Sequence, residues 1–321
     1  MVSRVSRVAA IDCGTNSIRL LIADLQGGSA DGRLRDVHRE TRIVRLGQGV
    51  DATGEFAPDA LARTRAALAD YAELLSAHRV ERVRMVATSA ARDVANRDVF
   101  FAMTADVLGA VLPGSVAEVI TGEQEAELSF RGAVGELDSA RAPFVVVDLG
   151  GGSTEIVLGG DRVVASYSAD IGCVRLTERC LHSDPPTPEE VAAARQVVRE
   201  RLEVALRVVP VEGARTWVGL AGTMTTLSAL AHNMTTYDAA VIHLSRVTGS
   251  DLLAVCDRLI SMTRSQRAAL PPMHEGRADV IGGGAIVVQE LARELRTRAG
   301  IDELTVSEHD ILDGIVLSLA G

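Results

Sequence analysis

Hydrophobic positions recur along this chain with two different periods, and this pattern predicts a protein of the α/β class. Apolar runs at 5–11 and 18–25 predict two strands joined by a turn at 13–17, and 35–47 predicts one or two more strands. The next expected elements are a helix over 57–79, a strand over 82–90, a helix near 97–111, a strand near 115–120 and a helix over 122–135.

The strand–turn–strand pattern returns at 143–158. After it, Thr187, Pro188 and Glu190 predict a capped start for a helix over 187–209. The segment 216–230 predicts a strand, a glycine turn and a helix, and 281–295 predicts a glycine turn that leads into another helix. We also expect a helix from near Ser250 and a last helix from Ser307, with Asp310 as its capping-box partner.

A chain of 321 residues has room for two domains. Because the pattern repeats, we expect one domain over 1–122 and a second over 123–306, each with a mixed five-stranded sheet. We expect the segment 307–321 to pack back on the first domain.

Composition excludes several classes of protein. The net charge of −10 and the 3% aromatic content argue against a nucleic-acid partner and a membrane partner. All 33 basic residues are Arg, so a lysine P-loop, a Schiff-base lysine and a pyridoxal-phosphate site are excluded. The four cysteines form no C-x-x-C pair and the histidines have no H-x-x-x-H spacing, which leaves a zinc site unsupported by spacing. A reducing cytoplasm is the expected location.

Two glycine turns share one pattern, in which Asp12, Gly14 and Ser17 recur as Asp148, Gly150 and Ser153. The pattern is Asp-x-Gly-x-x-Ser between two strands. Glycine lets the backbone present its N–H groups, and an Asp at a strand end can hold a hydrated cation. One such turn is typical of a tight hairpin, but two predict related halves that face one cleft. A Rossmann site is excluded, because 154–158 is a strand rather than a helix.

A third turn, "GLAGTMTT", leads from a strand into a helix. It would place Gly222 and Thr223 at a helix N-terminus, where free N–H groups favour an anion. A plain helix cap is the alternative interpretation.

Six motifs occur in the order found in the exopolyphosphatase / guanosine pentaphosphate phosphohydrolase family, and the chain resembles that family over nearly its whole length. They are "IDCGTNSIRLLIAD", "ATSAARDVANRD", "TGEQEAELSF", "VVDLGGGSTEIVLG", "GLAGTMTT" and "VIGGGAIVVQELA". The resemblance implies a short two-domain form of the actin, Hsp70 and sugar-kinase superfamily. It implies two RNase H-like domains with mixed sheets flanked by helices, and an active site in the cleft between them.

The resemblance also implies roles for individual residues. Glu125 is similar to the catalytic carboxylate, with Glu123 as the alternative, and Arg92 to an arginine that clamps the substrate. Asp148 is similar to a Mg²⁺ anchor, with Asp12 and Glu155 in support. The expected phosphate-binding residues are Asn16, Ser17, Arg19, Gly150, Gly151, Gly152, Ser153, Gly222 and Thr223.

Some of these residues have other interpretations. Arg19 and Glu155 alternate with core residues, so an inter-domain ion pair competes with a catalytic role for both. Cys13 is interpreted as a small buried side chain of the core rather than as a nucleophile, because no histidine lies near it in sequence.

These residues predict an exopolyphosphatase that releases terminal orthophosphate by metal-assisted attack of water. Guanosine pentaphosphate (pppGpp) is the alternative substrate. An ATP-binding kinase or ATPase and a non-catalytic polyphosphate sensor are alternatives of other classes, and the family resemblance favours a homodimer.

Overall fold

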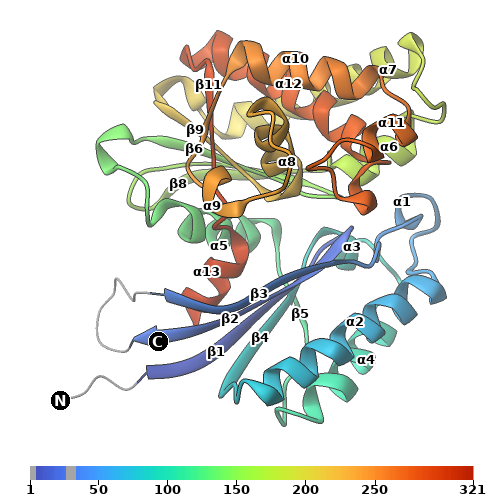
Figure 1. Ribbon diagram of the computed structural model, residues 1–321, viewed down its shortest axis with the longest axis vertical. Coiled ribbons are helices and arrows are strands. Elements are labelled where there is room, and N and C mark those ends of the chain that lie inside the picture. Colours follow the sequence, from blue (N-terminus) through green and yellow to red (C-terminus); the bar gives the residue numbers. More distant parts are fainter. Residues whose placement is uncertain (1–4, 27–33, 321) are drawn as a thin grey trace. The chain divides into compact units, whose positions relative to one another are not determined.

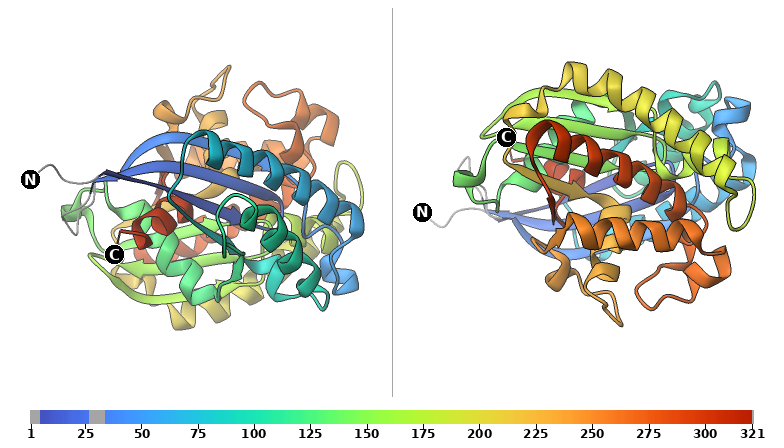
Figure 2. Two further views of the ribbon diagram at one scale, coloured as in Figure 1. Left: turned by 90° about the horizontal axis from the view of Figure 1, so that it is seen from below. Right: turned by 90° about the horizontal axis from the view of Figure 1, so that it is seen from above.

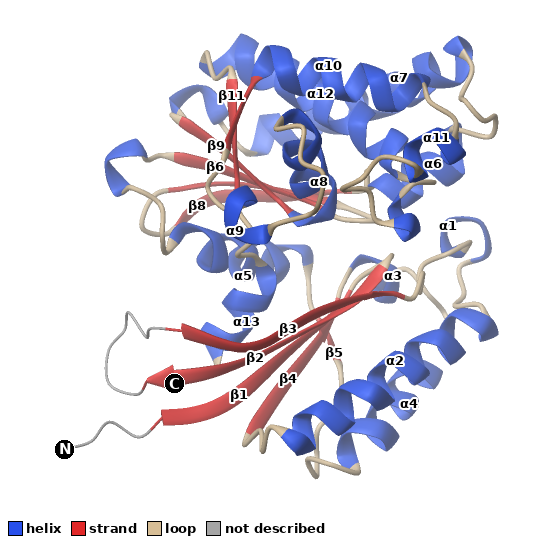
Figure 3. Cartoon of the chain, viewed as in Figure 1, coloured by secondary structure: helices blue, strands red, loops and turns tan. Residues whose placement is uncertain are grey.

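The computed structural model describes residues 5–26 and 34–320, and it divides into two compact units (Figures 1 and 3). Unit 1 comprises Met1–Gly132 and Ile311–Gly321, and unit 2 comprises Ala133–Asp310. The chain passes from unit 1 to unit 2 after Gly132, whereas the sequence placed a boundary near residue 122. It returns to unit 1 at Ile311.

Unit 1 is built on a mixed five-stranded sheet in the order β3-β2-β1-β4-β5. The first three strands form an antiparallel meander, and β4 and β5 continue the sheet in parallel with β1. The strands are β1 (Val5–Cys13), β2 (Ser17–Gln26), β3 (Leu34–Ile43), β4 (Arg82–Ala87) and β5 (Glu118–Val119). The helices are α1 (Val50–Thr53), α2 (Pro58–Ala77), α3 (Ser89–Arg92), α4 (Arg97–Gly109), α5 (Gly122–Val134) and α13 (Ile311–Ser318).

Both faces of this sheet are buried, because alternate residues of a strand point to opposite sides. Ile11 of β1 packs in the same core as Tyr71 of α2, and α4 lies beside α2 (Figure 1). Ala10 instead packs with Ile315 of α13 on the other face. The burial of both faces explains why the sequence of β1 and β2 is a nearly continuous apolar run.

Unit 2 repeats the topology of unit 1 and adds one edge strand, in the order β10-β11-β9-β6-β7-β8. Here β6, β7 and β8 form the antiparallel meander, and β9 and β11 extend the sheet in parallel with β6. The strands are β6 (Phe144–Leu149), β7 (Thr154–Gly159), β8 (Val163–Ala169), β9 (Thr216–Leu220), β10 (Arg246–Thr248) and β11 (Glu303–Val306). The two-sheet α/β fold predicted from the sequence is confirmed, although this sheet has a sixth strand.

The long helices of unit 2 lie side by side across one face of this sheet, with α12 between α7 and α10 (Figure 2, right). One apolar core joins them to the sheet. The helices are α6 (Cys173–Cys180), α7 (Pro188–Val208), α8 (Ala221–Ala231), α9 (Ala239–Ile242), α10 (Gly249–Ser261), α11 (Arg264–Ala268) and α12 (Ile281–Ala299). Short 3₁₀ turns occur at Ser139–Arg141, Val211–Gly213 and Glu275–Arg277. Among the described residues, no helix has both the length and the apolar character needed to cross a membrane.

Two predicted element starts are wrong. The last helix begins at Ile311 rather than at Ser307, because the Ser307 hydroxyl accepts a hydrogen bond from the His309 N–H and donates one to the His309 carbonyl, which holds a turn there. The glycines at 282–284 lie inside α12 rather than in a turn before it. They are small because other groups pack closely against them: a Cβ on Gly283 would lie 2.8 Å from the Cys173 carbonyl oxygen.

Helix α13 packs so closely on α5 that Gly314 leaves no room for a side chain. A Cβ at this position would lie 1.9 Å from the carbonyl oxygen of Leu128, which is backbone and cannot rotate away. We expect Gly314→Ala to lower the free energy of unfolding of unit 1 by about 1–3 kcal/mol, measured by urea denaturation. Gly109→Ala is the matched control, since a Cβ there meets nothing within 4 Å. Equal stability of the two variants would contradict the close packing.

Candidate active site

The turn between β1 and β2 in unit 1 is held from behind by backbone hydrogen bonds. Within the turn, Gly14 N–H donates to the Ser17 carbonyl at 2.9 Å. The Asn16 carbonyl accepts from Val44 N–H (3.1 Å) and from Arg45 N–H (2.9 Å), and the Thr15 carbonyl accepts from Gly47 N–H at 2.8 Å. Backbone N–H groups of the loop after β3 therefore hydrogen-bond to the Thr15 and Asn16 carbonyls of the turn.

The turn between β6 and β7 in unit 2 has the same internal bond, from Gly150 N–H to the Ser153 carbonyl at 3.0 Å. Here the supporting element is the start of α6. Cys173 N–H donates to the Gly150 carbonyl (3.0 Å) and Val174 N–H donates to the Gly151 carbonyl (2.9 Å). The Arg175 side chain donates through Nε to the Gly152 carbonyl at 2.8 Å.

These supporting bonds determine which way the turn N–H groups point. A trans peptide plane directs its C=O and its N–H in opposite directions. In unit 1 the N–H groups of Asn16 and Ser17 therefore point away from the loop at 44–47. In unit 2 the N–H groups of Gly151, Gly152 and Ser153 point away from α6. Successive N–H groups directed to one side form a concave site for an anion. These are residues that the sequence predicted to bind phosphate.

The three glutamates at the start of α5 differ in burial. Glu125 is only 8% exposed, whereas Glu123 and Glu127 are exposed. The helix begins with a reciprocal cap, because Thr121 N–H donates to Gln124 Oε1 (2.9 Å) and Gln124 N–H donates to Thr121 Oγ1 (3.2 Å). The spacing T-x-x-Q is a known sequence signal for such a cap, and our sequence analysis missed it.

Arg92, predicted to clamp the substrate, forms an ion pair with Glu125. Its Nη1 donates to Glu125 Oε2 at 2.7 Å and to the Ile120 carbonyl at 3.1 Å. A nearly buried carboxylate needs such a partner, since an unpaired charge in that position is costly. The structure therefore places Glu125, the predicted catalytic carboxylate, and Arg92, the predicted substrate-binding arginine, in one ion pair.

Asp12 and Arg19 also form a pair, across the β1–β2 hairpin where they are register partners. Arg19 donates through Nε (3.0 Å) and through Nη2 (2.7 Å) to the same oxygen, Asp12 Oδ2. This pair lies within one hairpin of unit 1 and is therefore not the inter-domain ion pair considered for Arg19, and it engages a carboxylate predicted to support a metal. The neighbouring Cys13 is buried, and burial raises the pKa of its thiol, which does not suit a nucleophile.

Asp148 and Glu155 are the equivalent register partners on β6 and β7 in unit 2. Both are buried, Glu155 at 1% exposure, and Glu155 Oε1 accepts a hydrogen bond from Ser168 Oγ at 2.7 Å. Their neighbours Val147 and Ile156 belong to the apolar core, so alternation turns both carboxylates to the opposite face of the sheet. Two carboxylates on one face are hard oxygen donors suited to Mg²⁺.

The third predicted anion site lies at the start of α8, and Gly222 is part of that helix rather than of a turn before it. Thr223 is buried and packs against Gly284 of α12. Arg277 was not among the predicted residues; its Nη1 donates to the Gly222 carbonyl (3.3 Å) and to Thr226 Oγ1 (3.2 Å). No local pattern marks Arg277, because it lies far along the chain and is brought to α8 by folding.

Comparison with known proteins gives a consistent result. The profile described as the Ppx/GppA phosphatase family matches residues 8–319. The chain is 83% identical over 317 residues to a Mycobacterium tuberculosis protein named exopolyphosphatase 2, and the alignment covers 99% of both chains. A solved structure titled an exopolyphosphatase-like protein superimposes with a TM-score of 0.93 at 42% identity, covering 98% of both chains. The Aquifex aeolicus Ppx/GppA family member superimposes with a TM-score of 0.79 at 33% identity, again over 98% of both.

A more distant relative has a different substrate in its name. It is the guanosine-5'-triphosphate,3'-diphosphate pyrophosphatase of Photobacterium profundum, which is 33% identical over 223 residues. The alignment covers 69% of this chain and 43% of that protein.

Gly172 allows α6 to approach the turn of unit 2. A Cβ there would lie 2.3 Å from the carbonyl carbon and oxygen of Gly151. We expect Gly172→Ala to displace the turn and to lower the affinity for tripolyphosphate, measured by calorimetry, at least about tenfold. A charge-assisted hydrogen bond contributes about 1.5–3 kcal/mol, so losing one has an effect of that size. Gly160→Ala should bind normally, since its Cβ would make an ordinary 3.8 Å contact. Unchanged affinity in Gly172→Ala would argue against phosphate binding by this turn.

Proposed function

The chain belongs to the Ppx/GppA phosphatase family, and on that premise we propose that it is an exopolyphosphatase that releases terminal orthophosphate from inorganic polyphosphate. The observation that carries the proposal is the 83% identity to exopolyphosphatase 2 over nearly all of both chains. The site supports it, because hydrolysis of a terminal phosphoryl group depends on positioned water and on neutralised charge, and needs no covalent intermediate.

Glu125 is the proposed general base. Its carboxylate orients the attacking water and accepts its proton as the bond to phosphorus forms. The burial of Glu125 and the exposure of Glu123 favour this choice over the alternative at Glu123. In the free protein Arg92 occupies Glu125 Oε2. When a phosphate oxygen accepts the hydrogen bond from the Arg92 guanidinium instead, Glu125 Oε2 becomes available to act on water.

The turn N–H groups and the arginine supply the charge that the substrate needs. Each polyphosphate unit carries negative charge, and donors fixed before the substrate arrives stabilise it without reorganisation. Asn16 and Ser17 in unit 1 and Gly151, Gly152 and Ser153 in unit 2 are the proposed donors.

Phosphatases of this family generally depend on a divalent metal. We propose that the metal is Mg²⁺ and that Asp148 and Glu155 hold it. The fit rests on their donor chemistry, since two hard carboxylate oxygens share one face of the sheet. When bound, the ion would neutralise phosphate charge and make phosphorus more electrophilic. Asp12 fits less well, because Arg19 already engages its Oδ2 atom.

The alternative substrate is pppGpp, whose terminal phosphate would be removed by the same chemistry. The name of the Photobacterium profundum relative favours it. A cytoplasmic location and a homodimeric state remain predictions from the sequence and from the family resemblance.

An assay of orthophosphate release tests the proposal directly. We expect faster turnover of polyphosphates of defined length than of pppGpp in parallel reactions, and Glu125→Gln should lower kcat by about 10²–10⁴-fold because the base is lost. Affinity for polyphosphate should not fall in that variant, since the side-chain shape is kept and Arg92 no longer has to leave a carboxylate. Glu123→Gln is the matched control on the same helix and should turn over normally. Faster release from pppGpp would favour the alternative, and equal losses in the two variants would exclude Glu125 as the base.

Asp148→Asn tests the metal assignment independently of turnover. A neutral amide is a poor ligand for a hard cation, so Mg²⁺ affinity measured by calorimetry should fall about tenfold or more. The exposed Asp161 after β7 offers the control Asp161→Asn, which should bind Mg²⁺ like the wild type. If both variants bind Mg²⁺ with wild-type affinity, Asp148 does not hold the ion.

A further inference from the structure

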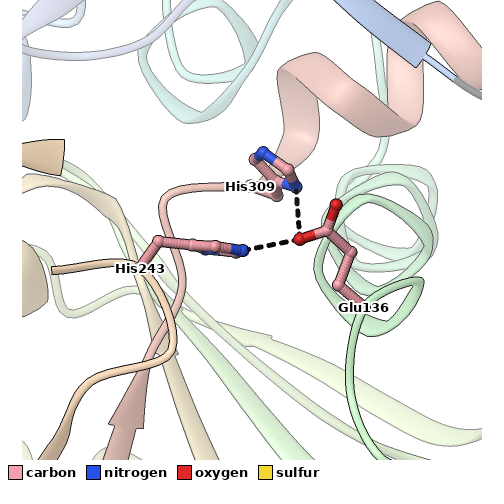
Figure 4. Close-up of side chains that lie close together, drawn as sticks. All are labelled: Glu136, His243 and His309. Carbon is pink, nitrogen blue, oxygen red and sulfur yellow. Dashed lines mark hydrogen bonds and ion pairs between the residues drawn. The ribbon is translucent and has the colours of Figure 1, made fainter. Parts of the chain in front are cut away.

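Three side chains that are remote in sequence meet on unit 2, and none of them belongs to the carboxylates described above. They are Glu136, His243 and His309, each offering one ligand atom, and these atoms all lie within 4.8 Å of one another (Figure 4). Glu136 follows α5, His243 ends α9, and His309 lies between β11 and α13. No sequence pattern marks this cluster, since the spacing rules for metal sites apply to ligands close together along the chain.

The distances within the cluster are close to those of a metal centre. Glu136 Oε2 lies 2.8 Å from His243 Nε2 and 3.9 Å from His309 Nδ1. Ligand atoms at about 2.0–2.1 Å from a tetrahedral zinc ion stand roughly 3.3 Å apart. The three atoms therefore need to move by only about an ångström to share one ion.

The donor set also defines the kind of ion. Two imidazole nitrogens and one carboxylate oxygen suit zinc and its neighbours in the first transition series, whereas Mg²⁺ prefers oxygen ligands alone. The Glu136 side chain is 57% exposed and the His309 side chain 33%, so an ion can enter and water can complete its coordination. Among the described residues no other His, Cys, Asp and Glu side chains meet in this way.

We propose that Glu136, His243 and His309 form a binding site for Zn²⁺ or a similar transition-metal ion, separate from the divalent metal of the phosphatase reaction. Glu136 lies just after Ala133, where the chain enters unit 2, and His309 just before Asp310, where it leaves. A bound ion ties these two segments together and restrains both. The site is therefore structural or regulatory rather than catalytic.

Binding requires a proton to move on His243. Its Nδ1 accepts a hydrogen bond from Glu308 N–H at 3.3 Å, so the neutral ring carries its proton on Nε2, which faces Glu136. An ion on Nε2 shifts that proton to Nδ1 and breaks the bond from Glu308 N–H. The Glu308 amide thus becomes a specific reporter of occupation.

Cobalt absorption provides the test, because tetrahedral or five-coordinate Co²⁺ absorbs visible light far more strongly than octahedral Co²⁺. We expect one Co²⁺ per chain with strong visible bands, displaced by Zn²⁺ but not by Mg²⁺. Exchange of the Glu308 amide with deuterium should become faster when Zn²⁺ is added. Zn²⁺ should also raise the melting temperature.

Variants separate this site from the active site. Glu136→Gln and His309→Gln should each weaken Co²⁺ binding about tenfold or more and abolish the strong bands. Asp148→Asn and the exposed control His182→Ala should keep them. Circular dichroism of the metal-free variants shows whether each one folds. Absence of the bands in the wild type, their survival in Glu136→Gln and His309→Gln, or their loss in Asp148→Asn would each overturn the proposal. None of these results depends on phosphatase activity.

Discussion

The candidate phosphate sites depend on one constraint: the carbonyl groups of each Asp-x-Gly-x-x-Ser turn are hydrogen-bonded from behind. In unit 1 the donors come from the loop at 44–47, and in unit 2 from the start of α6. The supporting backbone must approach closely, so it carries glycine at the contact. A Cβ on Gly47 would lie 2.4 Å from Thr15 Cγ2, and one on Gly172 would lie 2.3 Å from the Gly151 carbonyl. The loop at 44–47 and the start of α6 are unrelated structures, yet each directs the N–H groups of its turn away from itself.

Buried carboxylates impose a second constraint on unit 1. Asp12 and Glu125 are both largely buried, and each is held by an arginine, Arg19 and Arg92 respectively. Removing one partner of such a pair leaves an uncompensated charge, which costs about 3–5 kcal/mol. In the proposed function, a phosphate group that takes Arg92 from Glu125 must therefore offset the loss of this ion pair.

The sequence was informative where a pattern is local and failed where folding sets the environment. The two turns, the paired strands and the capped helix at Thr187 follow from neighbouring residues, and all are present. Strands β8, β10 and β11 and helix α6 were not predicted; β10 and β11 have only three and four residues, too few to show a period. The pairing of Arg19 with Asp12 was not predicted, although the two are register partners across the hairpin. Arg277 was missed because only the tertiary fold brings it to α8.

The segments that join the two units are each held at a close contact within their own unit. Inside unit 1 the carbonyl of Leu128 on α5 lies against Gly314 on α13, with no space for a methyl group. Inside unit 2 Glu136 and His309 approach to 3.9 Å. The two contacts differ in kind: the first is close backbone packing, while the second joins two partly exposed side chains. Unit 1 therefore holds this pair of segments by backbone packing, whereas unit 2 holds it by side-chain contacts.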